Sequence, residues 1–283
     1  MEVTTYKKYN PNAEIKGNPN NWIKEQFDNT NSIIKYLIEY KPELVDKYVN
    51  DLVSKFITVT STIEKKDGIY DFPPIDESYT FLDKNPQLKA IIREFILKHL
   101  NPIHQCSENP EEFIVHSLNK AKALERASYY RLKTLTEMLG KDKGIELYTK
   151  ILTRIVQDMR KKNPPKNDVN ITEHREGAIK YWSKIGLGEF TVCVLDEHMD
   201  LYRFDTCITH EALKELNDPD IAYYASCFIG DIPAWNKGKI IKMRRTQTLH
   251  HGDFCDELYW DSRYHENPEQ PTLEFTNKLD KKE

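Results

Sequence analysis

FTVCVLDEHMDLYRFD, residues 190–205, contains two short segments rich in β-branched, aromatic and aliphatic residues, FTVCVL (190–195) and MDLYRFD (199–205), joined at Glu197 and His198. β-Branched and aromatic residues in such short runs predict strands, and so short a connection predicts a tight turn between antiparallel partners. KIIKMRRTQTL (239–249) and FCDELYW (254–260) predict a second hairpin with Gly252 in its turn. The C-terminal half should therefore contain a mostly antiparallel sheet.

The chain before this sheet has a helical pattern. Apolar residues recur at three- and four-residue spacing from Trp22 to about residue 63. Further helices are predicted at 88–100, from Pro110 to Gly140, from there to the breaker KKNPPKND (161–168), and at 172–185, 209–217 and 219–228. The predicted fold class is α+β, with a helix-rich N-terminal half and a C-terminal, mostly antiparallel sheet flanked by helices.

These patterns divide the chain into four parts. Residues 1–20, rich in Asn, Pro, Lys and Gly, are expected to be a flexible lead-in, and residues 21–108 a helical N-terminal region in which 66–86 form a long ordered loop. Residues 109–265 are expected to form the α+β domain. The polar residues 266–283 are expected to be a frayed tail.

Composition excludes several classes of protein. The 283 residues carry a net charge of −4 without a basic stripe, so no nucleic-acid partner is expected. Neither a signal peptide nor a run of about 20 apolar residues is visible, so we expect a cytoplasmic protein without a membrane partner. Five cysteines, an odd number, argue against a disulfide framework. The helix faces leave room for a homodimer.

The segment from Cys207 to Asp256 carries an ordered set of motifs: a Cys, a helix, a second Cys followed by Asp, an R-T-x-T strand, a Gly and a Cys-Asp pair. It resembles the signature region of the L-2-amino-thiazoline-4-carboxylic acid hydrolase family. The matching positions are Cys207, the helix at 211–217 with Pro219, Cys227, Asp231, Arg245, Thr246, Gln247, Thr248, Gly252, Cys255 and Asp256. The match covers roughly residues 185–261.

The resemblance implies hydrolytic opening of a cyclic isothiourea that bears a carboxylate. Arg245 is the candidate clamp for that carboxylate, because strand alternation places it on the apolar face with Ile241 and Met243 while Arg244 faces solvent. The alternative is an internal ion pair of Arg245 with Asp231 or Asp256. The other substrate-binding candidates are Thr246, Thr248, Cys227 and Cys207.

Cys255, Asp256 and Asp231 are the catalytic candidates. A thiolate attacks directly when a cation lowers its pKa, and a carboxylate activates water. Cys255 and Asp256 should point to opposite faces of their strand, so only one of them is expected to line a pocket. The structural alternatives are a small buried hydrophobe for Cys255 and a core residue for Cys227.

Soft ligands for zinc are also present, but their spacings match no common zinc motif, and we expect neither a metal nor a cofactor. They are Cys207, His210, Cys227, His250, His251 and Cys255. His250 and His251 lie in a predicted turn, so exposure at the surface is the simpler expectation for both.

One departure from the family pattern bears on function. The family continues Cys-Asp with an aromatic, an Arg and another aromatic, whereas this chain has Glu257, Leu258 and Tyr259. The leading hypothesis is a hydrolase that opens a small cyclic C–S or C–N compound. The alternatives are a repurposed biosynthetic enzyme of the same fold, acting on a cysteine- or amine-derived metabolite, and a non-catalytic small-molecule-binding module.

Overall fold

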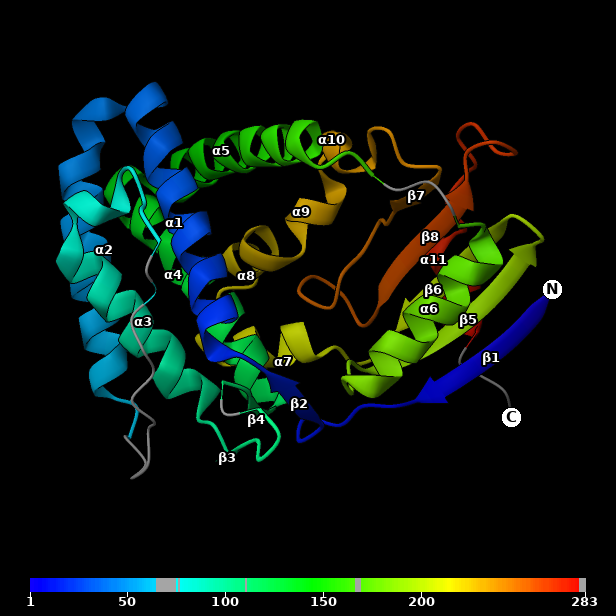
Figure 1. Ribbon diagram of the computed structural model, residues 1–283. Coiled ribbons are helices and arrows are strands. Elements are labelled where there is room, and N and C mark those ends of the chain that lie inside the picture. Colours follow the sequence, from blue (N-terminus) through cyan, green and yellow to red (C-terminus); the bar gives the residue numbers. More distant parts are fainter. Residues whose placement is uncertain (65–74, 76, 110, 166–168, 280–283) are drawn as a thin grey trace.

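The computed structural model describes residues 1–64, 75, 77–109, 111–165 and 169–279. It has two parts, a helical body and a sheet with its own covering helices (Figure 1). The fold is α+β, as predicted. No helix within these ranges combines the length and apolar character of a membrane span.

Five long helices build the helical body: α1 (Pro19–Tyr40), α2 (Val45–Ser61), α3 (Pro86–Leu100), α4 (Ser117–Leu139) and α5 (Lys141–Lys162). Asn18 caps α1 by accepting from the Asn20 amide at 2.9 Å. Gly140, with φ at +85°, separates α4 from α5 in a conformation that favours glycine. Two short 3-10 helices, η1 (Pro42–Leu44) and η2 (Leu82–Lys84), connect the long ones.

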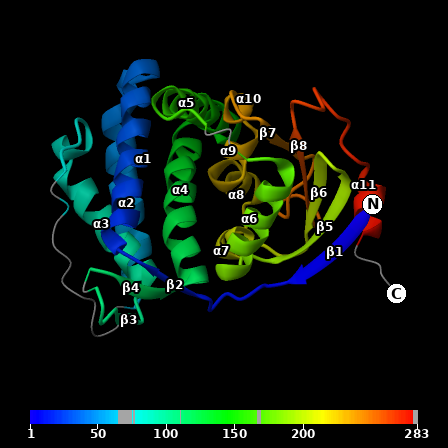
Figure 2. The ribbon, with the colours of Figure 1, turned by 45° about the vertical axis from the view of Figure 1, so that its right-hand side comes forward.

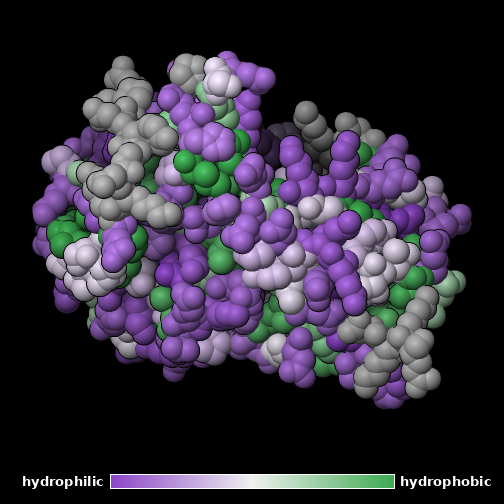
Figure 3. Space-filling view, turned by 90° about the horizontal axis from the view of Figure 1, so that it is seen from below, coloured by the Kyte–Doolittle hydropathy of each residue, from purple (hydrophilic) through white to green (hydrophobic). Residues whose placement is uncertain are grey.

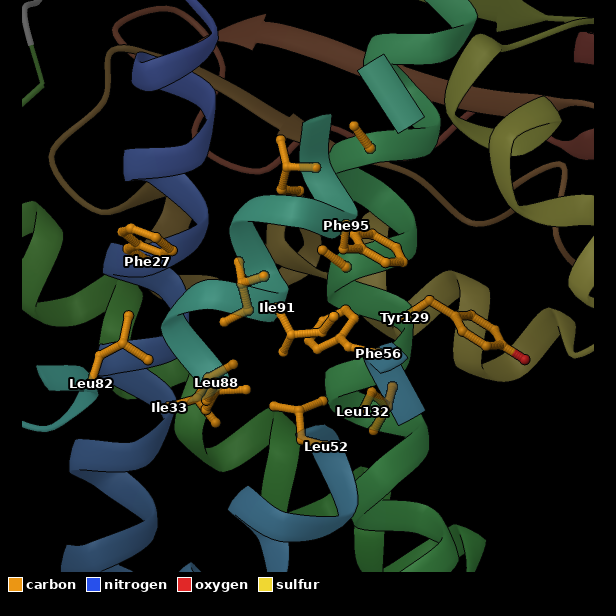
Figure 4. Packing of buried hydrophobic residues seen from close by; sticks show 14 of the residues in the cluster. Phe27, Ile33, Leu52, Phe56, Leu82, Leu88, Ile91, Phe95, Tyr129 and Leu132 are labelled. Carbon is orange, nitrogen blue, oxygen red and sulfur yellow. The ribbon is translucent and has the colours of Figure 1, made fainter. Parts of the chain in front are cut away.

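Aromatic and aliphatic side chains from these helices form the main core. Phe56 of α2 and Phe95 of α3 pack edge to face, with ring centroids 4.8 Å apart (Figure 4). Leu52, Leu88 and Leu132 are fully buried around them. Each such side chain contributes about 1.5–3 kcal/mol by leaving water. The core continues through residues on both sides of position 108, so the expected boundary between 108 and 109 passes through it.

The larger sheet is antiparallel throughout and has the order β1-β5-β6-β8-β7. Its strands are β1 (Glu2–Lys7), β5 (Glu189–Asp196), β6 (Met199–Phe204), β7 (Ile241–Arg244) and β8 (Cys255–Asp261). The turn between β5 and β6 falls at Glu197 and His198, which confirms that prediction. Helix α6 (Ile171–Lys184) covers one face and α11 (Leu273–Lys278) the other (Figure 2).

Between β6 and β7 the chain crosses to the helical body in short helical turns. These are α7 (Ile208–Leu213), η3 (Lys214–Leu216), α8 (Pro219–Ser226), α9 (Phe228–Asp231) and α10 (Pro233–Asn236). The helices predicted at 209–217 and 219–228 correspond to α7 with η3 and to α8, whereas α9 and α10 were not predicted. The lower face of the molecule is largely polar, with apolar side chains in scattered groups (Figure 3).

The lead-in prediction was wrong. β1 pairs with β5, and Tyr6 stacks on Phe190 at 5.1 Å, so the first residues cover an otherwise open sheet edge. β2 (Glu14–Gly17) pairs with β4 (Phe113–His116), which also pairs with β3 (His104–Gln105). The helix predicted from Pro110 therefore begins only at Ser117, and Pro110 itself lies outside the described residues.

The tail prediction was also wrong up to residue 279. Helix α11 packs Phe275 and Leu279 against the sheet, and Gln270 donates to the Asp256 carboxylate at 3.0 Å. Residues 66–74 and 76 of the loop expected at 66–86 lie outside the described residues, but Tyr79 and Leu82 are buried in the main core.

Candidate functional site

Arg245 lies at the centre of a network that contains two carboxylates. Its Nε donates to both oxygens of Asp231, at 2.9 and 3.1 Å, and its Nη1 donates to Glu257 Oε1 at 2.9 Å. Its Nη2 donates to the Cys227 carbonyl. Burial alone lowers the pKa of Arg245, but Glu257 and Asp231 outweigh burial and raise it. The ion pair with Asp231, one of the two alternatives for Arg245, is thus present.

Local sequence explains how Arg245 reaches this position. Met243 is buried on β7, and Arg245, two residues later, continues in the same direction although the strand ends at Arg244. Gly230 permits the approach, because a Cβ there would lie 2.9 Å from Met243 Cε and 3.0 Å from Arg245 Nη2. Arg244 was expected in solvent, but it lies over the Trp260 ring at 5.3 Å and its Nε is buried.

Asp256 holds the chain in the turn that follows Arg245. Its carboxylate is fully buried and accepts from the Thr246 amide at 2.9 Å, the Gln247 amide at 2.6 Å and the Gln270 side chain at 3.0 Å. The Asp256 carboxylate therefore lies on the face of the sheet that α11 covers, where these donors bind it. Asp256 and Cys255 therefore lie on opposite faces, as strand alternation predicts.

A pocket of about 380 Å³ opens beside this turn, a size typical of small-ligand sites. We call it the Arg245 pocket, and it is lined by Tyr223, Asp231, Arg245, Thr246, Gln247, Thr248 and His251. Four of the eight predicted site residues share this wall: Asp231, Arg245, Thr246 and Thr248. Thr248 is only 4% exposed, and its enclosed hydroxyl has no hydrogen-bond partner. An unsatisfied buried hydroxyl costs free energy, which a ligand with a polar group would recover.

The three cysteines predicted for the site, Cys207, Cys227 and Cys255, lie near one another but do not line this pocket. Cys255 packs among Phe190, Val192, Tyr202 and Phe204, and accepts from the Leu249 amide at 3.1 Å. Burial, together with nearby Cys207, Cys227 and Glu257, raises the pKa of Cys255 far above its usual range.

The other two thiols have the same character. Burial raises the pKa of Cys227 to about 12 and also raises that of Cys207. All three thiols are therefore protonated at neutral pH and are poor nucleophiles. All five cysteines are free, and across the described ranges no group of three or more His, Cys, Asp or Glu residues is arranged to hold a metal ion.

Two histidines expected at the surface differ from each other. His251 is exposed and contacts Asp220 at 3.0 Å. His250 is buried, which corrects that expectation, and contacts His210 at 3.4 Å and Ser226 at 3.3 Å. Burial lowers the pKa of His250 to about 4, so its ring is neutral at physiological pH.

Sequence reasoning did not assign Glu257, Tyr259 or Tyr223 to the site. Glu257 joins Arg245 to Tyr259, whose hydroxyl donates to Glu257 Oε2 at 2.9 Å. Tyr223 donates to Asp231 Oδ2 at 2.8 Å. Strand alternation carried a usable signal, because residues 255, 257 and 259 must share one face of β8. Glu257 stands where the family pattern has a different residue, and it supplies the second carboxylate for Arg245.

Comparison of the chain with models of known protein families, with curated proteins and with solved structures finds no match. The resemblance to the thiazoline-carboxylate hydrolases stays a prediction from the residues. Function is therefore argued from the geometry of the Arg245 pocket.

Proposed function

We propose that this protein is a hydrolase that opens a small cyclic C–S or C–N compound bearing a carboxylate, and that the compound binds in the Arg245 pocket. The observation that carries the proposal is the wall of this pocket. It combines a hydrogen-bonded carboxylate, Asp231, a buried guanidinium, Arg245, and the unpartnered hydroxyl of Thr248. The resemblance in the segment 207–256 supplies the reaction class.

Charge supports a substrate of this kind. A cyclic isothiourea is basic, so a carboxylated one carries a positive amidinium and a negative carboxylate. Asp231 is placed to accept from the amidinium, while each terminal nitrogen of Arg245 has a second N–H beyond its contacts with Glu257 and the Cys227 carbonyl. These N–H groups and the Thr248 hydroxyl are suited to the substrate carboxylate.

Asp231 is the base in the proposed reaction. It removes one proton from a water molecule whose oxygen adds to the carbon between nitrogen and sulfur. The ring C–S bond then breaks, and its electron pair stays on sulfur, which takes the proton from Asp231. The proton of the new hydroxyl passes to solvent as the C=O bond forms, which leaves a urea and a free thiol.

A carboxylate base is favoured over a thiolate nucleophile. Cys207, Cys227 and Cys255 all have raised pKa values, caused first by burial. The guanidinium of Arg245, whose charge acts on Cys227, is already engaged by Asp231 and Glu257. A thiolate at neutral pH needs an adjacent cation that is free to stabilise it.

The test is release of thiol from L-2-amino-thiazoline-4-carboxylate by the full chain, followed with a thiol reagent. We expect turnover by the wild type. Thr248→Val should raise KM about tenfold, the value of one hydrogen bond to a charged group, while stability changes by less than about 1 kcal/mol. Binding of the compound without any product on prolonged incubation would contradict the proposal and favour a binding module.

A further inference from the structure

A second cavity, of about 390 Å³, lies beside the start of β7, whereas the Arg245 pocket lies beyond the end of that strand. Residues from the end of α5, the start of α6, α10, β7 and β8 line it. We call it the Trp235 pocket, and the residues that matter for its chemistry are Arg160, His174, Trp235, Lys239, Met243 and Tyr259. Neither the predicted site nor the proposed reaction uses it.

Two cations meet at the indole ring of Trp235. The Arg160 guanidinium lies 4.4 Å from the ring centroid, and the Lys239 ammonium lies 4.2 Å from it. The described residues that line the pocket include no carboxylate, and neither cation forms an ion pair with any described residue. Two positive charges in one partly buried cavity therefore lack a described counter-charge.

Polar nitrogens in the same cavity also lack partners. Arg160 donates from Nη2 to the Trp235 carbonyl at 3.0 Å, but its enclosed Nε has no hydrogen-bond partner. His174 packs on the Tyr259 ring at 4.8 Å, and its enclosed Nδ1 has none either. Enclosed donors without partners cost free energy, and native proteins retain few of them.

We infer that the Trp235 pocket binds a small organic anion. Its carboxylate or phosphate group contacts Arg160, Lys239 and His174, and its flat apolar body packs on Trp235, Tyr259 and Met243. The anion supplies the missing counter-charge and the missing acceptors together. The net charge of the chain is −4, so these cations are a local feature and not part of a generally basic surface.

The ionisation of Lys239 supports this assignment. Burial, followed by the nearby charge of Arg160, lowers the pKa of Lys239 to about 8. Among the described residues, the other ionisable groups that line the pocket are His174, whose pKa burial lowers, and Tyr259, whose pKa burial raises, so both are neutral near pH 8. A bound anion stabilises the charged ammonium, so affinity should fall above about pH 8 and binding there should take up a proton.

Isothermal titration calorimetry of the full chain tests the inference. The probes are phenyl phosphate, benzoate, inorganic phosphate and neutral benzyl alcohol. At about pH 7 we expect binding of at least one aromatic anion, weaker binding of inorganic phosphate, and none of benzyl alcohol. Comparison of phenyl phosphate with benzoate shows which oxyanion the pocket prefers.

Variants locate the site. Lys239→Met and Arg160→Met should each weaken the preferred anion about tenfold or more, whereas Lys237→Met, which removes an exposed lysine two residues away, should not. The inference is overturned if no anion binds at millimolar concentration, or if Lys239→Met and Arg160→Met bind as tightly as the wild type. Binding is measured without turnover, so this result is independent of the reaction proposed for the Arg245 pocket.

Discussion

Lys239 and Arg245 lie just beyond the two ends of one short strand, β7, yet their charges are in opposite circumstances. The Arg245 guanidinium contacts two carboxylates and a carbonyl, and its pKa is raised. Lys239 lies beside another cation, Arg160, with no carboxylate among the described residues of its pocket, and its pKa is lowered. The paired cation holds Asp231 in the pocket where we propose the hydrolysis, whereas the unpaired ones are suited to the anion that we propose as a ligand.

The largest effect on stability should come from removing the paired cation, Arg245. Arg245→Met leaves Asp231 and Glu257 close together without a cation, and should lower the free energy of unfolding by about 3–5 kcal/mol in urea titrations. Lys242→Met, on the same strand and without an ion pair to a described residue, is the matched control and should change it by less than about 0.5 kcal/mol. A similar small change for Arg245→Met would show that the network contributes little.

The turn that carries Arg245 should be the next most sensitive feature. Asp256→Ala removes the acceptor for the Thr246 and Gln247 amides and for Gln270, and should cost about 2–4 kcal/mol in the same titrations. Asp253→Ala, at an exposed position in the same connection, should be nearly neutral. Equal effects at the two positions would contradict a holding role for Asp256.

Removing the unpaired cation Lys239 should change the free energy of unfolding in the opposite direction. Lys239→Met should raise the free energy of unfolding by about 1–2 kcal/mol at neutral pH, a value reduced for partial exposure, because it removes a buried charge without a counter-charge. The pKa of Lys239 rises from about 8 in the folded chain to 10.5 when unfolded, so the unfolded chain binds more protons between these values. Wild-type stability therefore rises with pH across this window.

The pH profile checks the sign of that prediction. The gain from Lys239→Met should be complete below about pH 8 and vanish above 10.5, where the lysine is neutral in both states. Lys237→Met should show no such profile, because its side chain is exposed. A gain that is independent of pH would mean that packing, not charge, limits the wild type.

Local pattern predicted the parts of the fold that depend on neighbours in sequence. The β5–β6 hairpin follows from alternation and a two-residue turn, and the inward direction of Arg245 follows from Met243 two residues earlier. β1 was missed because its residues are mostly polar, and only pairing with β5, about 185 residues away, makes them a strand.

In the candidate site, too, the sequence predicted only what depends on neighbouring residues. The sequence left Asp231 as a possible ion-pair partner of Arg245. No local pattern could show that Glu257 is a second partner, because the contact between Glu257 and Arg245 depends on how β7 and β8 pair. The burial of His250 depends likewise on contacts with Ser226 and His210, which the fold brings from other segments. The Trp235 pocket has no local sequence signal, whereas four of the residues that line the Arg245 pocket were predicted for the site from the sequence.

The thiol-release assay with two single variants tests the central claim most directly, that a carboxylate in the Arg245 pocket performs the hydrolysis. Asp231→Asn keeps the size of the side chain and should lower kcat about 100-fold or more, while Cys255→Ala should retain activity within roughly threefold. Circular dichroism should show both variants folded. Full activity in Asp231→Asn together with loss of activity in folded Cys255→Ala would contradict the claim and assign the chemistry to the thiol.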